Sequence, residues 1–177
     1  MSGRSVIPIS VLAAMIDWAL AAPAGRPIVE VGVYRGGSAL ELAAVARHKG
    51  VGLHLFDTFA GMPFAAADDK HQVGDFSDTS LTEIQRLIPI AHCHAGIFPQ
   101  TLPRALTDIG FAHIDVDQYR STIEAIDALW PRMAQGGIMW FDDVELEPAR
   151  RAIYERFHDD GLQRAPEGRL FVIRNDQ

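Results

Sequence analysis

The sequence has only one cysteine, Cys93, so it cannot form an internal disulfide. It also has no run of lysine and arginine. Its 16 basic and 23 acidic side chains give a formal net charge of −7. An acidic chain without a basic patch is a poor match for a nucleic-acid backbone or an anionic membrane. No G-x-S-x-G motif and no P-loop are present. We therefore expect a cytoplasmic protein in a reducing compartment, with neither nucleic acid nor membrane as a partner.

The chain also lacks an uncharged apolar run long enough to span a membrane. The nearest approach is VIPISVLAAMIDWALAAPA, residues 6–24, whose apolar core and A-x-A-like end resemble a signal peptide. However, Asp17 interrupts this run and Arg4 is the only basic residue before it. Apolar residues recur there at helical spacing: Val11, Leu12, Met15, Ile16 and Leu20. We predict that residues 1–25 contain an amphipathic helix that packs on the rest of the chain, with Asp17 facing solvent.

Apolar residues make up 48% of the chain and charged residues 22%, as in a globular domain. From residue 28 onwards, short β-branched runs alternate with segments of helical spacing. We interpret the 177 residues as a single domain, with residues 28–174 as its α/β core. The predicted fold is a doubly wound, Rossmann-like and mostly parallel sheet that helices cover on both faces, with a C-terminal antiparallel hairpin.

Individual elements follow from local patterns. Five runs are predicted strands: PIVEVGV, VGLHLF, IAHCHAGI, GFAHIDV and GGIMWFDD. Three S-x-x-E pairs predict capping boxes at helix starts: Ser38 with Glu41, Ser80 with Glu83, and Ser121 with Glu124. Gly50 is a predicted helix stop, and Pro131 is predicted to kink a helix or begin a new turn. A last helix is expected over roughly residues 147–158, before the hairpin. The polar stretch 57–78 is long for a compact domain, which indicates a functional lid or loop.

In doubly wound sheets, ligands bind beyond the carboxyl ends of the strands. The first such end is VEVGVYRGGS, where Gly32, Gly36 and Gly37 permit a tight turn and close approach to a ligand. Ser38 then begins a helix whose N-terminal dipole favours an anionic group. A plain tight turn is the alternative. Glu30 favours the binding interpretation, because a carboxylate inside a central strand is costly unless it binds something.

Asp57 ends the second predicted strand. It lies 57 − 36 = 21 residues after Gly36, where nucleotide-binding folds place an acid on ribose hydroxyls. The alternative is that Asp57 caps the following turn. With Glu30 and the glycines, ribose binding is the favoured interpretation.

Two acidic pairs end the last two parallel strands: Asp115 with Asp117, and Asp142 with Asp143. Residues two apart on a strand share one side, whereas Asp142 and Asp143 converge only where the chain already turns. Three such oxygens suit a hard octahedral ion such as Mg²⁺. Alternatively, the acids cap helices and form salt bridges with Arg120, Arg150 or Arg151.

Histidines give a weaker signal. His92 and His94 share one side of the third strand, with no further ligand nearby, and we interpret them as part of an exposed edge strand. A lone His71 or His113 is more often structural than catalytic.

The segment VEVGVYRGGSALEL resembles the E-x-G-x-x-x-G motif of class I S-adenosylmethionine-dependent methyltransferases. Five further segments together resemble the macrocin O-methyltransferase (TylF-like) family: FDTFAGMP, GDFSDTSL, HAGIFPQTLP, HIDVDQYRST and GGIMWFDDV. The resemblance covers roughly residues 28–144. It implies the class I methyltransferase fold and S-adenosylmethionine as the cofactor.

The resemblance also implies roles for individual residues. Glu30 and the glycine turn would hold the methionine end of the cofactor, and Asp57 its ribose. Gly96 and Ile97 would flank the adenine. The implied cofactor-binding residues are Glu30, Gly32, Tyr34, Gly36, Ser38, Asp57, Thr58, Gly96, Ile97 and Asp115. Those that match the family's Mg²⁺ ligands are Asp115, Asp142 and Asp143.

The implied reaction is methyl transfer to a hydroxyl of a small acceptor, a sugar or another natural product. A divalent cation makes a bound hydroxyl more acidic, and Asp117 would act as the general base. Some relatives use a histidine one position further on, where this chain has Gln118. In place of the usual aliphatic run before the acidic pair, this chain has WFDDV.

Two other functions compete with this one. A non-catalytic cofactor-binding module needs the cofactor site but no acceptor pocket. A nicotinamide-dependent oxidoreductase predicts G-x-G-x-x-G, which the spacing of Gly32, Gly36 and Gly37 does not match. The apolar N-terminal helix would also permit a homodimer.

Overall fold

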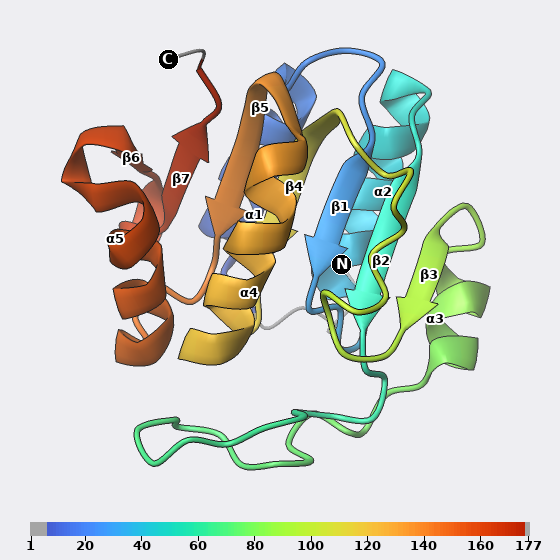
Figure 1. Cartoon of the computed structure of the whole chain (residues 1–177). Helices are drawn as coiled ribbons and strands as arrows, with labels where there is room; N and C mark the ends of the chain where they lie inside the picture. Colours follow the sequence, from blue (N-terminus) through green and yellow to red (C-terminus); the bar gives the residue numbers. More distant parts are fainter. Residues whose placement is uncertain (1–6, 176–177) are drawn as a thin grey trace.

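A computed structural model describes residues 7–175 of the chain. Residues 1–6, with Arg4 and the first part of the predicted N-terminal segment, lie outside the described residues. Within them, the elements follow the predicted alternation of strands and helices (Figure 1).

The strands form one sheet in the order β3-β2-β1-β4-β5-β7-β6 (Figure 1). The parallel strands are β1 (Ile28–Val31), β2 (Leu53–Asp57), β3 (His92–Ala95), β4 (Ile109–Ile114) and β5 (Met133–Phe141). The closing hairpin of β6 (Leu162–Arg164) and β7 (Leu170–Ile173) joins β5 in antiparallel pairing. The predicted fold class is therefore confirmed, with the hairpin at one edge of the sheet and β3 at the other.

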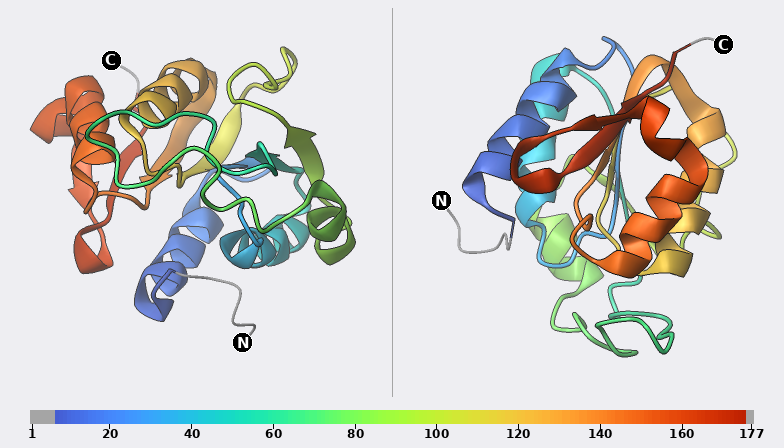
Figure 2. Two further views of the ribbon diagram at one scale, coloured as in Figure 1. Left: turned by 90° about the horizontal axis from the view of Figure 1, so that it is seen from below. Right: turned by 90° about the vertical axis from the view of Figure 1, so that its left-hand side faces the viewer.

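Helices cover both faces of the sheet (Figures 1 and 2). One face packs against α1 (Ile9–Ala21), α2 (Gly37–Lys49) and α3 (Leu81–Leu87). The other packs against α4 (Tyr119–Leu129) and α5 (Glu147–Gly161). Two short 3₁₀ turns, η1 (Trp130–Arg132) and η2 (Pro166–Gly168), complete the regular structure. Because successive strand residues point to opposite faces, β1 sends Ile28 into one core and Val29 into the other.

Of the three predicted capping boxes, only the one at Ser80 is confirmed. Its hydroxyl accepts a hydrogen bond from Glu83 N, at 3.3 Å, at the start of α3. The Ser38 prediction is wrong, because α2 begins at Gly37, after left-handed Gly36, and places Ser38 inside its first turn. The Ser121 prediction is also wrong, since α4 begins at Tyr119, after the N-cap residue Gln118, and Ser121 lies inside its first turn. Gly50 ends α2 and Pro131 lies in η1, as predicted.

Helix α1 packs on the sheet, but its buried face differs slightly from the predicted one. Val11, Leu12 and Met15 are buried, whereas Ala19 takes the next buried position and Leu20 is 42% exposed. The last turn is held by Lys49, whose Nζ donates hydrogen bonds to three carbonyl oxygens: those of Ala19, Leu20 and Ala22. Among the helices in residues 7–175, none is long and apolar enough to cross a bilayer.

Residues 58–80 connect β2 to α3 and form neither helix nor strand, as the polar composition predicts. We call this segment the β2–α3 loop. It runs across the carboxyl ends of the parallel strands, below the strands in Figure 1 and in front of them in the left view of Figure 2. The loop therefore covers the place where a doubly wound fold binds its ligands.

Candidate functional site

A cavity of about 350 Å³ opens at the carboxyl ends of β1, β2, β3, β4 and β5, beneath the β2–α3 loop. Its volume lies within the range of small-molecule sites. Most of the predicted site residues line it: Gly32, Tyr34, Asp57, Thr58, Gly96, Ile97, Asp115, Asp117, Asp142 and Asp143. The structure therefore brings together residues that follow all five parallel strands, β1 to β5, and that are far apart in the sequence.

Three predicted cofactor-binding residues, Glu30, Gly36 and Ser38, do not line this cavity, and their roles in cofactor binding stay predictions. Ser38 is buried within the first turn of α2. A side chain at Gly36 would come within 3.0 Å of Ile84, so this glycine permits close packing against α3. Glu30 is completely buried in the centre of the sheet.

The partner of Glu30 is His113, which lies opposite it on β4. His113 Nδ1 and Glu30 Oε1 are 2.9 Å apart, and neither residue is exposed. Burial alone would lower the pKa of His113, but the Glu30 carboxylate raises it, and the net shift is upward. His113 on the neighbouring strand thus supplies part of the compensation that a buried carboxylate requires, while Glu30 Oε2 has no hydrogen-bond partner among the described residues.

The turn after β1 approaches β4 very closely at Gly32. Gly32 has φ +88°, and a Cβ atom there would lie 1.7 Å from the carbonyl oxygen of Asp115. Gly32 N also donates to the carbonyl oxygen of Phe56, at 2.9 Å. Only a glycine satisfies both the left-handed backbone and the close approach.

Asp57 holds the same turn from the end of β2. Its Oδ2 accepts hydrogen bonds from the backbone nitrogens of Val33, at 2.7 Å, and Tyr34, at 3.0 Å. Its Oδ1 accepts from Phe59 N, at 2.8 Å. Asp57 also lines the cavity, so ribose binding stays a prediction, but its role in shaping the glycine turn was not predicted.

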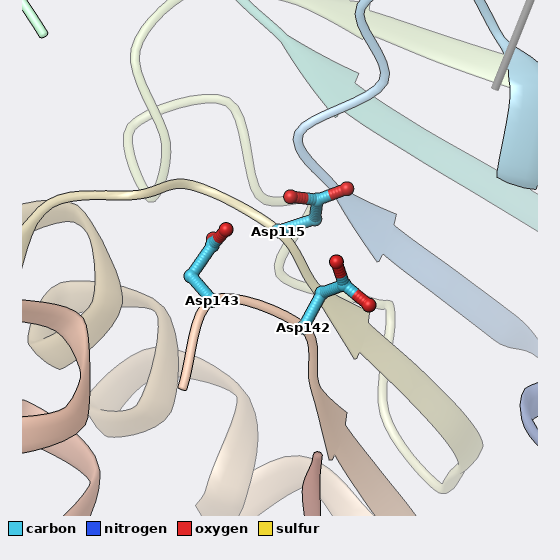
Figure 3. Close-up of side chains that lie close together, drawn as sticks. All are labelled: Asp115, Asp142 and Asp143. Atoms are coloured by element: carbon cyan, nitrogen blue, oxygen red, sulfur yellow. The ribbon is translucent and has the colours of Figure 1, made fainter. Parts of the chain in front are cut away.

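Three carboxylates converge where β4 and β5 end (Figure 3). Asp115, Asp142 and Asp143 each offer an oxygen, and these atoms lie within 4.8 Å of one another. Strand β5 ends at Phe141, so the turn that follows allows both adjacent aspartates to point into one space. Burial raises the pKa of Asp115 and Asp143, and the neighbouring acids raise both further. The carboxyls of Asp115 and Asp143 are therefore hard to ionise unless a positive charge lies nearby. Such a cluster of oxygen ligands fits a hard divalent cation.

One member of this cluster has a protein cation beside it. Arg169, from the turn before β7, donates from Nε to Asp142 Oδ1 at 3.1 Å and also pairs with Glu145. Arg169 is 7% exposed, and its pair with Asp142 is buried. The arginines that the sequence suggested as partners pair elsewhere: Arg120 with Glu124, Arg151 with Asp68 and Glu147, and Arg150 with a carbonyl oxygen.

Asp117 lies outside this three-carboxylate cluster. Strand β4 ends at Ile114, and Asp117 has φ +60°, so Asp115 and Asp117 do not share one side of a strand as predicted. Asp117 N instead donates to Asp143 Oδ2, at 2.7 Å. Burial raises the pKa of the Asp117 carboxyl to about 6, although an interaction between its side chain and that of Asp143, and the charge of Lys70, oppose the shift. The Asp117 side chain lines the cavity beside the three-carboxylate cluster.

Residues at the start of α4 and on α5 hold the β2–α3 loop over the cavity. Gln118 Nε2 donates to the Phe64 carbonyl oxygen, at 2.7 Å, and to Asp69, at 3.1 Å. The Arg120 guanidinium lies 4.1 Å from the centre of the Phe64 ring. Arg151 on α5 pairs with Asp68 at 3.0 Å. Sequence reasoning missed these contacts, since nothing local to Gln118 indicates partners that lie 54 and 49 residues away.

Histidines also gather at the far edge of the sheet. His92 and His94 lie on edge strand β3, as predicted, but His54 on β2 adds a third ring, which the sequence analysis did not place. His54 Nδ1 and His94 Nε2 are 3.1 Å apart. Burial and the two other histidines lower the pKa of His54 to about 4. These rings do not line the cavity.

Comparisons with known proteins agree with this geometry. The chain is 31% identical over 154 residues to 8-demethyl-8-(2,3-dimethoxy-α-L-rhamnosyl)-tetracenomycin-C 4′-O-methyltransferase of Streptomyces olivaceus, covering 72% of this chain and 56% of that relative. It is 27% identical over 149 residues to mycinamicin III 3″-O-methyltransferase of Micromonospora griseorubida, covering 72% and 59%. The chain therefore matches little more than half the length of these curated relatives.

Solved structures show the same fold. The O-methyltransferase NovP superimposes with a TM-score of 0.84 at 22% identity, covering 99% of this chain and 84% of that one. The calicheamicin methyltransferase CalS11 gives a TM-score of 0.77 at 21% identity, covering 93% and 77%.

The pattern of the macrocin-O-methyltransferase (TylF) family matches residues 11–168, which include most of α1, every parallel strand, the glycine turn and both acidic strand ends. This chain belongs to that family.

Proposed function

We propose that the protein transfers a methyl group from S-adenosylmethionine to a hydroxyl of a small acceptor, with Mg²⁺ or a similar divalent cation at Asp115, Asp142 and Asp143. One observation carries the proposal: a single cavity is lined both by the glycine turn and by the three-carboxylate cluster. A methyl donor on the turn and an acceptor at the cluster would therefore share one space.

The donor side of the cavity is built from the ends of β1, β2 and β3. Gly32 and Tyr34 present the turn, Asp57 and Thr58 follow β2, and Gly96 with Ile97 follows β3. Gly96 N donates to the carbonyl oxygen of Asp57 at 2.9 Å, which holds the ends of β2 and β3 together. This arrangement supports a ligand that extends across three strand ends, as an adenosine joined to methionine does.

The acid side of the cavity fits the cation. Three converging carboxylates have one close protein cation among the described residues, Arg169, so negative charge remains for a divalent ion to neutralise. When bound there, the cation would make a ligated hydroxyl more acidic. The cavity lining offers the cation carboxylate oxygens, which suit Mg²⁺ or Mn²⁺.

The residues of this chain then have distinct tasks. The glycine turn and the β2–α3 loop position the two reactants and exclude water. Asp117 accepts the proton of the acceptor hydroxyl, since a carboxyl with a pKa of about 6 is ionised at neutral pH and is still a useful base. S-Adenosylmethionine, when bound, would supply the methyl group: the acceptor oxygen would bond to its carbon while the carbon–sulfur bond breaks, and the electron pair would stay on sulfur.

We infer the acceptor class from the named relatives. One acts on a rhamnosyl tetracenomycin, another on mycinamicin III, and a third on demethyldecarbamoylnovobiocin, as their names state. A small hydroxylated acceptor, with a sugar hydroxyl as the leading case, is consistent with a cavity of about 350 Å³. The predicted homodimer, cytoplasmic location and absence of nucleic-acid or membrane partners stay predictions.

A methyl-transfer assay tests the proposal. The protein is incubated with S-adenosylmethionine labelled on its methyl group and with methyl α-L-rhamnopyranoside, a simple deoxysugar probe. We expect label in the sugar with Mg²⁺, a fall of roughly 100-fold or more in EDTA, and recovery when Mg²⁺ is restored. If the protein binds the cofactor but labels no sugar under any of these conditions, the non-catalytic module gains support instead. Equal rates in Mg²⁺ and EDTA would contradict the metal part of the proposal.

A further inference from the structure

Arg169 is a buried arginine that reaches the three-carboxylate cluster from the C-terminal hairpin. It directly precedes β7, whose first residue, Leu170, lies opposite Phe141, the last residue of β5. Asp142 follows Phe141, so the antiparallel pairing brings Arg169 beside it. The backbone of Arg169 is fixed in the hairpin turn, because its N–H donates to the Pro166 carbonyl oxygen at 3.2 Å.

The guanidinium engages both oxygens of Asp142. Its Nε donates to Oδ1 at 3.1 Å and its Nη2 donates to Oδ2 at 3.4 Å, so the two groups meet as a fork. The third nitrogen, Nη1, donates to Glu145 Oε2 at 2.9 Å. The side chains of Arg169 and Asp142 are each 8% exposed, whereas that of Glu145 is 56% exposed. The buried contacts of Arg169 are therefore directed at one proposed ligand of the cation.

Arg169 neutralises part of the charge of the cluster. The cluster comprises the three carboxylates of Figure 3, and a guanidinium in a protein is always protonated. Three carboxylates and one guanidinium leave two negative charges, which one divalent cation balances. The other lysine or arginine that lines the cavity, Lys70, acts on Asp117 instead.

A fixed positive charge beside a cation site has two effects. Without the cation, it stabilises the fold, because it offsets the repulsion among buried carboxylates. With the cation, it repels the ion and shares the Asp142 oxygens that the ion would use. Both effects favour the metal-free protein over the metal-bound one, so Arg169 is expected to weaken cation binding.

We propose that Arg169 is a built-in counter-charge, which replaces the cation when the site is empty and keeps the bound cation exchangeable. This inference rests on the cation in the proposed function. Arg169 acts through Asp142 and is a positioning residue. A purely structural ion pair predicts that loss of Arg169 loosens Asp142 and weakens the cation site. The counter-charge predicts that the same loss lowers stability without Mg²⁺ but tightens Mg²⁺ binding.

Calorimetric titration of Mg²⁺ at pH 8 and thermal unfolding in EDTA test the proposal on the whole chain. Arg169→Met is expected to bind Mg²⁺ about 10- to 100-fold more tightly than the wild type. Its Tm in EDTA is expected to be roughly 5–10 °C lower. Arg169→Lys keeps the charge but not the fork, and its Mg²⁺ affinity is expected to stay within about threefold of the wild type.

Arg156→Met is the matched control. Arg156 also forms a fork, with Asp127 on α4, at 2.6 and 2.9 Å, and neither residue lines the cavity. This substitution removes the same charge and the same kind of contact from another part of the molecule. Its Mg²⁺ affinity is expected to stay within about twofold of the wild type.

A second measurement uses the wild type and does not depend on how a variant folds. The ¹⁵N-labelled Nε–H signal of Arg169, assigned by its loss in Arg169→Lys, is expected to move when Mg²⁺ is added. The reason is that the Asp142 carboxylate, which accepts this hydrogen bond, would become a ligand of the ion. A signal that stays in place while calorimetry shows Mg²⁺ binding would overturn the proposal.

Two results of the titrations would also overturn it. One is an Arg169→Met affinity equal to or weaker than that of the wild type. The other is an Arg169→Lys affinity as tight as that of Arg169→Met, because the charge would then not be the cause. Mg²⁺ binding by none of these proteins would remove the cation from the proposed function, and this inference with it. Binding by the wild type without a gain in Arg169→Met counts against the role of Arg169 alone.

Discussion

Asp115→Asn is expected to abolish Mg²⁺ binding and, at the same time, to stabilise the metal-free protein. In the folded protein Asp115 lies against Asp142 and Asp143, and its pKa is raised by burial and then by those neighbours. An amide removes one of the mutually repelling charges and also removes a ligand. We expect a gain of about 1–2 kcal/mol in the free energy of unfolding, or roughly 2–6 °C in Tm, without metal.

The gain should depend on pH in a defined direction. A carboxyl whose pKa is higher in the folded state than in the unfolded state holds its proton longer when folded, so its ionisation destabilises the fold as the pH rises. For Asp117, the loss of stability is expected between about pH 4, the pKa of an unfolded carboxyl, and about pH 6, its pKa in the folded protein. For Asp115 and Asp143 the loss extends well above pH 4. The stability difference between Asp115→Asn and wild type is therefore expected to be small at pH 4 and to grow towards pH 7.

Asp142→Asn is the matched comparison, because it removes a ligand from the same cluster but also weakens a buried ion pair. Arg169 would keep Glu145 but lose the charge of Asp142. We expect this variant to lose Mg²⁺ binding and roughly 1–3 kcal/mol of stability. Thermal unfolding of both variants with and without Mg²⁺, between pH 4 and pH 8, measures these effects. Undiminished stabilisation by Mg²⁺ in both variants would show that the cation binds elsewhere.

Gly32→Ala is expected to cost the protein both its cofactor site and much of its stability. The new Cβ atom would lie 1.7 Å from the carbonyl oxygen of Asp115, so the end of β1 must move away from the end of β4. The turn that moves is the one that Asp57 holds by two hydrogen bonds and that lines the cavity. We expect a loss of roughly 3 kcal/mol or more in unfolding free energy. Affinity for S-adenosylhomocysteine is expected to fall about 100-fold or more.

Gly50→Ala controls for the backbone conformation alone. Gly50 also has a left-handed backbone, with φ +67°, but no atom lies within 4 Å of the position of an added Cβ. This substitution is expected to cost about 1 kcal/mol and to leave cofactor affinity unchanged. Chemical denaturation measures the stability of the two variants, and calorimetric titration measures their affinity for S-adenosylhomocysteine. Together they separate the effect of the close Cβ contact from the effect of the left-handed backbone alone. Equal effects of the two substitutions would mean that the close approach of β1 and β4 does not matter.

Most of the fold could be predicted from the sequence because it depends on local periodicity. Apolar runs of β-branched residues set the parallel strands, and helical spacing with Gly50 sets the intervening helix. The two failed capping boxes show the limit of local pattern. Ser38 and Ser121 have the right neighbours, but the helix starts are set by the glycine turn and by Gln118, which neighbouring strands and the loop hold in place.

The site could be predicted in outline for a similar reason, since parallel strands bring their carboxyl ends to one edge. The contacts that decide each side chain's task could not be predicted. Glu30 pairs with His113 across the sheet, and Asp142 pairs with Arg169 from the closing hairpin. His71 faces Asp117, at 3.7 Å, only because the β2–α3 loop folds back over the strand ends. These partners are distant in sequence, and no spacing rule connects them.

The claim that most needs testing is that the glycine turn and the acidic cluster form one site for a cofactor and a cation. The most direct measurement is calorimetric titration of S-adenosylhomocysteine into the protein with Mg²⁺ and again with EDTA, followed by titration of Mg²⁺ into the wild type and Asp142→Ala. We predict cofactor binding in both solutions, and Mg²⁺ binding that the wild type shows and Asp142→Ala loses. No binding of S-adenosylhomocysteine in either solution would contradict the account, and the carboxylates would then be assigned a structural role.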